Sequence, residues 1–235
     1  MIDRRRCLMA LSYSPLALVP GCIAKTQPAQ HSAFGKTSIE ACLAIAFDLS
    51  GSFVNELASK AFPMVLRLID AFDNHAMGSD AGLIVLSQIS GNDQAVLFEG
   101  SASQLQAEFP SPEAMEAFLR DRAKPDRSPI YTATRQTIDY VNSIAGIGPE
   151  TKLLTVLCSD LRDSESDRQA RSREGYRMLD SLKVYQQKGG AIACYFVDPQ
   201  EVRRWQRVFE LAEFRDEQFL IATELRRDPP LPRLF

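Results

Sequence analysis

Three oxygen-bearing side chains at alternate positions follow the first apolar run of this sequence. Asp48, Ser50 and Ser52 form a D-x-S-x-S pattern directly after Cys42–Phe47. In an extended turn alternate side chains point the same way, so one carboxylate and two hydroxyls can face one cation. A hard cation such as Mg²⁺ or Mn²⁺ prefers about six oxygen ligands in near-octahedral geometry. The pattern therefore indicates a divalent-metal site, although the same residues could also be an N-cap and turn ahead of a helix.

The elements that must position these side chains alternate along the chain between apolar runs and stretches of helical periodicity. Strands are predicted over 42–47, 81–89, 95–98, 153–158, 191–197 and 218–222, and helices over 53–72, 112–121, 130–144, from a polar stretch at 161–172 to about 187, and 202–212. The second and third strands flank the turn signal Gly91-Asn92-Asp93 and are expected to form a hairpin. Near-continuous apolar strands separated by helices predict an α/β fold. We expect a doubly wound, mainly parallel sheet with one antiparallel edge strand and helices on both faces.

Ligands of such sheets bind at the carboxyl ends of the strands, near the point where the strand order reverses. The residues in that position are the segment beginning at Asp48, the pair Ser159 and Asp160, and Asp198. These side chains are therefore the ones to consider for binding.

At the D-x-S-x-S motif the sequence resembles the von Willebrand factor A (vWA) family, and the resemblance covers about residues 38–222. The metal-ion-dependent adhesion site (MIDAS) of that family combines this motif with a threonine from a later loop and an aspartate at the end of the fourth strand. The resemblance implies that Ser128 takes the threonine position and that Asp160 is the strand-end aspartate. Thr132 is the competing candidate, but choosing it would place Thr137 where the family has a small helix residue.

The resemblance implies a metal-dependent protein-binding module, used for adhesion or scaffolding, that is not an enzyme and has no small-molecule substrate. The implied ligands of one Mg²⁺ or Mn²⁺ ion are Asp48, Ser50, Ser52, Ser128 and Asp160. A coordination position left to water would keep the ion electrophilic toward an acidic side chain of a protein partner. Because Asp48 is expected in a surface turn, Asp48→Ala is expected to abolish metal binding with little loss of fold.

The N-terminal residues resemble a bacterial export signal. A triple arginine at positions 4–6 precedes the uncharged stretch Cys7–Val19, in the manner of a twin-arginine motif, and Leu18-Val19-Pro20-Gly21-Cys22 resembles a lipobox. We expect an export signal over 1–22 with a lipidated Cys22, a flexible linker over 23–37, a vWA domain over 38–222 and a Pro- and Arg-rich tail over 223–235. This organisation predicts a lipid-anchored protein of the bacterial cell envelope that faces the periplasm or the surface. An uncleaved N-terminus is the alternative.

Two other function classes compete with this hypothesis. A cytosolic vWA subunit serving an ATPase partner requires the lipobox interpretation to be wrong. A hydrolase with Asp48 as nucleophile would resemble D-x-D-x-T enzymes of dehalogenase type, but Ser50 stands where their second aspartate would be. Nucleic acid is excluded as a partner because the net charge is −3 and the sequence contains no local basic face.

Several other residues are expected to be structural. Cys42, Cys158 and Cys194 lie in apolar runs and are predicted to be buried, reduced thiols. Trp205 lies on an amphipathic helix and is predicted to pack in or beside the core. Arg162 and Asp163 follow Asp160 closely and either shape the rim of the metal site or belong to a solvated loop.

Overall fold

The computed structural model describes residues 38–50, 61–75, 81–89, 94–122 and 127–223. All of them belong to the compact unit formed by residues 33–235. The predicted export signal with Cys22, the linker, Ser52 and nearly all of the tail lie outside the described residues. Among the helices that are described, none has the length and apolar character needed to span a bilayer.

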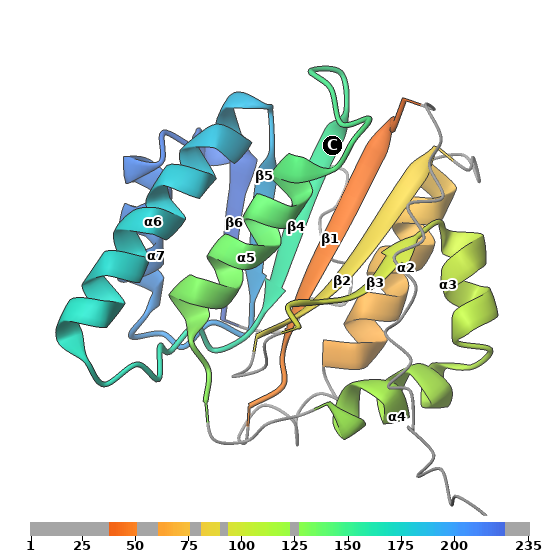
Figure 1. Ribbon diagram of the computed structural model, residues 1–235, viewed down its shortest axis with the longest axis horizontal. Coiled ribbons are helices and arrows are strands. Elements are labelled where there is room, and N and C mark those ends of the chain that lie inside the picture. Colours follow the sequence, from red (N-terminus) through yellow and green to blue (C-terminus); the bar gives the residue numbers. More distant parts are fainter. Residues whose placement is uncertain (1–37, 51–60, 76–80, 90–93, 123–126, 224–235) are drawn as a thin grey trace, which may run out of the picture. The chain divides into compact units, whose positions relative to one another are not determined.

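Six strands form one sheet in the order β3-β2-β1-β4-β5-β6 (Figure 1). Their bounds are β1 Ala41–Asp48, β2 Gly82–Ile89, β3 Val96–Gly100, β4 Lys152–Cys158, β5 Ala191–Tyr195 and β6 Phe219–Ala222. All neighbouring strands are parallel except β2 and β3, which pair antiparallel at the sheet edge. The predicted fold class, including the hairpin and its antiparallel edge strand, is confirmed.

The helices are α2 Phe62–His75, α3 Ala102–Glu108, α4 Pro112–Asp121, α5 Ile130–Ser143, α6 Arg168–Gln187 and α7 Val202–Leu211, with a short 3₁₀ turn, η2, at Asp216–Gln218. Helix α3 was not among the helices predicted from the sequence. This helix buries only Leu105 and so lacks an apolar stripe, but Ser101 and Gln104 form a reciprocal capping box that fixes its start. The capping box was the only sequence signal for α3.

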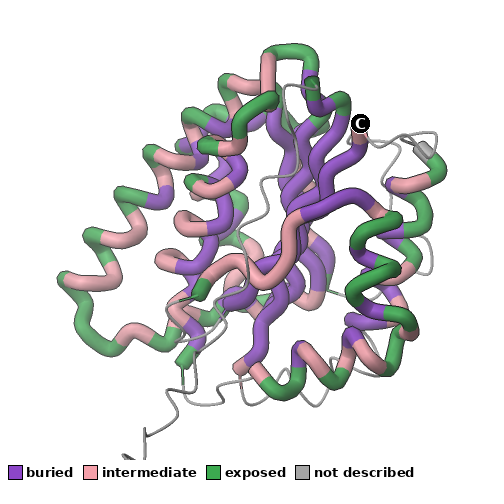
Figure 2. The backbone as a smooth tube through the Cα atoms, turned by 45° about the vertical axis from the view of Figure 1, so that its right-hand side comes forward, coloured by how far each residue is buried: buried purple, intermediate pink, exposed green. Residues whose placement is uncertain are grey.

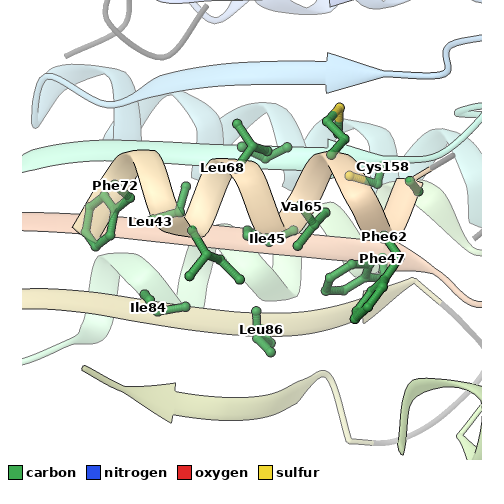
Figure 3. Packing of buried hydrophobic residues seen from close by; sticks show 14 of the residues in the cluster. Leu43, Ile45, Phe47, Phe62, Val65, Leu68, Phe72, Ile84, Leu86 and Cys158 are labelled. Atoms are coloured by element: carbon green, nitrogen blue, oxygen red, sulfur yellow. The ribbon is translucent and has the colours of Figure 1, made fainter. Parts of the chain in front are cut away.

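One face of the sheet is covered by α2, α3 and α4. The large alternate side chains of β1, Leu43, Ile45 and Phe47, point to this face because successive residues of a strand alternate between faces. They pack beneath α2, whose Val65 and Leu68 are fully buried and spaced three residues apart (Figure 3). The tube in Figure 2 shows the inner strands buried along nearly all of their length, whereas the edge strands β3 and β6 are mostly half-buried and the helices alternate between buried and exposed residues.

The opposite face is covered by α5, α6 and α7, and α5 lies in front of the sheet in Figure 1. Here β1 presents small side chains, among them Ala44 and Ala46, which leave room for a helix close to the strand. The buried hydroxyls of Ser87 on β2 and Thr137 on α5 form a hydrogen bond of 2.9 Å. This bond satisfies two polar groups that would otherwise be costly inside the core.

The parallel strands β1, β4 and β5 end at the same edge of the sheet, so the loops that follow them lie together. Leu161 follows β4 and Phe196 follows β5, and both have positive φ angles, 61° and 68°. A non-glycine residue in this region of backbone space carries strain that the surrounding structure must hold. Buried contacts hold Leu161: its N–H donates to Ser159 Oγ, and its carbonyl oxygen accepts from the Trp205 indole.

Candidate metal centre

Asp48 is the last residue of β1 and is 1% exposed. Its Oδ1 accepts a hydrogen bond from the Ser50 backbone N–H at 2.9 Å. Its Oδ2 accepts two hydroxyl hydrogen bonds, from Ser128 at 3.1 Å and from Ser159 at 2.6 Å. The expectation that Asp48 sits in a surface turn is therefore wrong, because β1 runs one residue further than predicted and neighbouring loops cover its end.

Ser128 reaches Asp48 from the loop ahead of α5, and its backbone fixes it there. The Ser128 N–H donates to Ser164 Oγ at 2.7 Å, and the Ser164 N–H donates to the Ser128 carbonyl oxygen at 3.0 Å. This reciprocal pair joins the loop ahead of α5 to the loop after β4. Thr132 lies in the first turn of α5. Of the two competing candidates, Ser128 is thus the one whose hydroxyl bonds to Asp48.

Ser159 is a further component of this site, which was expected at the strand ends but was not among the predicted ligands. It is fully buried after β4, and its Oγ donates to Asp48 and accepts from the Leu161 N–H at 2.9 Å. The hydroxyl therefore links the ends of β1 and β4. Its position directly after an apolar strand and before Asp160 is the sequence signal that places it at the site. Ser164 lies in a polar stretch and had no comparable signal.

Asp160 is half-buried beside this cluster. Burial raises the pKa of its carboxyl above the ordinary value, and the negative charges of Asp48 and Asp198 raise this pKa further. Arg162 opposes the increase, since its backbone N–H donates to Asp160 Oδ1 at 2.9 Å and its guanidinium is positive. The part of this increase that comes from Asp48 and Asp198 reflects neighbouring negative charge, which a bound cation would offset.

Arg162 and Asp163, which follow Asp160 in the loop after β4, both bond to other segments of the protein. Arg162 forms an ion pair with Asp198 in the loop after β5. The Asp163 carboxylate accepts the Tyr131 N–H at 3.2 Å and the Glu165 N–H at 2.8 Å. Asp163 therefore caps the first turn of α5 from another loop and helps to hold the segment that carries Ser128.

The donor set fits a hard divalent cation. The hydroxyls of Ser128 and Ser159 donate hydrogen bonds to Asp48, so the Ser128 oxygen keeps its lone pairs for another interaction. Asp160 supplies a second carboxylate. No group of three or more His, Cys, Asp and Glu residues suited to a metal occurs in the described parts of the chain. Carboxylate and hydroxyl oxygens are hard donors, which suit Mg²⁺ or Mn²⁺ better than Zn²⁺.

The structure brings four of the five predicted ligands to the same end of the sheet, with different contacts. Asp48 and Ser128 are in contact, Ser50 is bonded to Asp48 through its backbone, and Asp160 is close enough for its charge to couple to that of Asp48. Ser52 lies outside the described residues. Metal ligation by any of them stays a prediction.

Comparison with known proteins identifies the fold. No protein-family model and no curated protein match the chain, but solved structures do. The VWA domain of SpRpn10 aligns with a TM-score of 0.54 and 12% identity, over 81% of this chain and 90% of that domain. The pilus adhesin SpaC from Lactobacillus rhamnosus GG aligns at 0.55 and 13%, over 81% of this chain but only 28% of the adhesin. The N-terminal domain of TFIIH p34 aligns at 0.50 and 14%, over 83% of this chain and 93% of that domain.

These alignments establish a vWA fold. At identities of 12 to 14% the likeness extends to the fold alone and assigns no role to individual residues.

Proposed function

We propose that this protein is a non-enzymatic, metal-dependent protein-binding module, tethered to a bacterial membrane through lipidated Cys22. The fold is shared with the pilus adhesin SpaC, which supports a binding role. One observation carries the metal proposal. The Asp48 carboxylate accepts hydrogen bonds from two serine hydroxyls, and a second carboxylate, that of Asp160, lies close enough for the two charges to interact.

The chain's own residues would hold the ion in a defined way. Asp48 orients the Ser128 hydroxyl by accepting its hydrogen bond, which turns the oxygen lone pairs away from Asp48. Asp160 supplies negative charge from the end of β4, and Ser50 and Ser52 supply further hydroxyls. A bound Mg²⁺ or Mn²⁺ would act as an electrophile toward an aspartate or glutamate of the partner protein.

The geometry argues against a hydrolase with Asp48 as nucleophile. A nucleophilic carboxylate must reach the electrophilic atom of its substrate, but Asp48 is 1% exposed. Both of its oxygens accept hydrogen bonds from Ser50, Ser128 and Ser159. These contacts suit a group that positions others.

Calorimetric titration with Mg²⁺ and with Mn²⁺ tests the metal proposal. Wild type should bind one ion at millimolar concentration or below, and Asp160→Asn should bind at least tenfold more weakly because it removes one of two carboxylate charges. Asp180→Asn is the matched control, since this exposed aspartate lies on α6 and should leave the titration unchanged. Failure of wild type to bind either ion, or equal binding by Asp160→Asn, would overturn the proposal.

The protein-binding part needs a separate experiment. Immobilised wild type should retain an envelope protein in Mg²⁺ and release it in chelator, and immobilised Asp160→Asn should not retain it. Retention that depends neither on metal nor on Asp160 would contradict a metal-dependent module.

The membrane tether rests on the sequence of the N-terminal residues. Mass spectrometry of the membrane fraction should find a mature N-terminus at a lipid-modified Cys22. An intact Met1 or an unmodified Cys22 in that fraction would reject the anchor without affecting the metal proposal.

A further inference from the structure

A hollow of about 370 Å³ opens between α6, α7 and the first turn of α5, away from the sheet. Its size is at the lower end of the range of about 300–1,000 Å³ found for ligand pockets. Tyr131 forms part of its wall, and the Tyr131 ring lies 5.9 Å from that of Trp205, which is fully buried. Tyr131, whose ring packs against buried Trp205, therefore forms one wall of the hollow, which we call the α6–α7 groove.

Apolar side chains are unusually exposed at this groove. Tyr176 is 70% exposed and Leu211 is 46% exposed, and both line it. In the described part of the chain, the only other large hydrophobic residue with comparable exposure is Val184, at 47%. Exposed apolar surface that gathers at one hollow is typical of a binding site.

The rim of the groove is basic. Arg168 and Arg171 of α6 and Arg204 of α7 line it. Arg204 is paired with Glu201, at 2.7 Å and 3.1 Å. Within the described residues Arg168 and Arg171 have no ion-pair partner. The nearby acid Glu174 is already engaged by two other arginines. Two guanidinium groups thus remain available beside an apolar hollow.

The residues of α6 that line the groove lie on one face of the helix. Arg168, Arg171, Gly175 and Leu179 recur three or four residues apart and line the groove, so they share one helix face. Arg173 lies on α6 outside that set. The combination of fork-shaped guanidinium donors with an apolar hollow matches a carboxylate-bearing, amphipathic peptide.

We propose that the α6–α7 groove binds a segment of a partner protein in which an apolar side chain is flanked by aspartates or glutamates. The apolar side chain enters the hollow beside Tyr131, Tyr176 and Leu211, and the flanking carboxylates pair with Arg168 and Arg171. The hollow favours a peptide over a flat lipid surface because it lies between two helices and has room for an inserted side chain. This binding does not require the metal centre.

The test uses a fluorescein-labelled, amidated peptide with a central Leu-Phe pair and three glutamates on each side, followed by anisotropy in the presence of chelator. The peptide should bind, binding should weaken as salt is raised, and peptides with lysines for the glutamates or glycines for Leu-Phe should not bind. The double substitution Arg168→Glu with Arg171→Glu should weaken binding roughly tenfold or more, since two attractions become repulsions. The matched charge control Arg173→Glu should bind like wild type.

A second pair of variants tests the apolar contact. Tyr176→Ala should weaken binding severalfold, whereas Val184→Ala, on the same helix but outside the groove, should not. These positions are exposed, so the variants are expected to fold. Unchanged binding by the double arginine variant or by Tyr176→Ala would overturn the proposal.

Two further outcomes would also overturn it. Peptide binding that appears only after Mg²⁺ is added, or that is lost in Asp160→Asn, would place the binding site at the metal centre instead. Tighter, Arg168- and Arg171-dependent binding to phosphatidylserine vesicles than to the peptide would make the groove a lipid-binding surface. Because the peptide assay is run without metal, failure of the groove and failure of the metal centre give separate results.

Discussion

Replacing Asp48 by alanine should destabilise the protein even when no metal is present. The substitution removes the acceptor of three hydrogen bonds, which come from the Ser50 N–H and the hydroxyls of Ser128 and Ser159. Hydrogen bonds to a charged group contribute about 1.5–3 kcal/mol each. Part of that sum is offset because the variant no longer buries a carboxylate and because the two hydroxyls can rotate toward other acceptors. We expect a net loss of roughly 2–4 kcal/mol in the free energy of unfolding.

Urea unfolding in chelator measures this loss, because chelator removes any contribution from metal binding. The midpoint should fall with little change in the slope of free energy against urea concentration. Asp180→Ala, an exposed aspartate on α6, is the control and should change stability by less than about 0.5 kcal/mol. An equally small effect of Asp48→Ala, or an increase in stability, would refute the role assigned to the carboxylate.

Three further predictions concern the strand ends around Asp48 and the buried strand cysteines. Ser159→Ala should lower metal-free stability by about 1–3 kcal/mol in urea unfolding, since it leaves a buried N–H without its acceptor; an unchanged midpoint would contradict the bridging role of this hydroxyl. Asp160→Asn should raise metal-free stability at neutral pH: the pKa of Asp160 is raised in the folded state, so wild type loses stability as the pH rises through that pKa, whereas the neutral amide does not. The greater stability of the variant should disappear in acid, where Asp160 of wild type is protonated, and a stability difference that does not change with pH would contradict this explanation. Burial raises the pKa of Cys42 to about 12 and also raises those of Cys158 and Cys194, so peptide mapping after iodoacetamide treatment at pH 8 should find these three thiols unmodified in the native protein and modified in urea; native-state labelling would show that they are accessible.

The sheet was predictable because its strands carry unusually clear signals. β1 and β4 are almost wholly apolar, and such runs occur where both faces of a parallel sheet are covered. The start of α4 at Pro112 after the cap Ser111 also agrees with its sequence signals. The predicted state of the three strand cysteines, free and buried, is confirmed.

The sequence was less informative where long-range contacts decide the structure. α3 is held by a capping box and tertiary packing, and seven residues with one buried leucine give little periodicity. The burial of Asp48 depends on loops that lie far away along the chain, since Ser128 and Ser159 are 80 and 111 residues distant. Local pattern predicted which side chains gather at the strand ends, but it could not predict that two serine hydroxyls would enclose the carboxylate.

The central claim, a divalent-metal site at the ends of β1 and β4, is tested most directly by paramagnetic broadening. Sub-stoichiometric Mn²⁺ is added to ¹⁵N-labelled protein, and amide signals are followed in two-dimensional NMR spectra. The signals of Ser50, Ser128 and Asp160 should broaden first, while those of Gly100 and Thr151 should stay sharp because they lie at the other ends of the strands. Broadening centred elsewhere, or spread evenly over exposed carboxylates, would contradict a metal centre at Asp48.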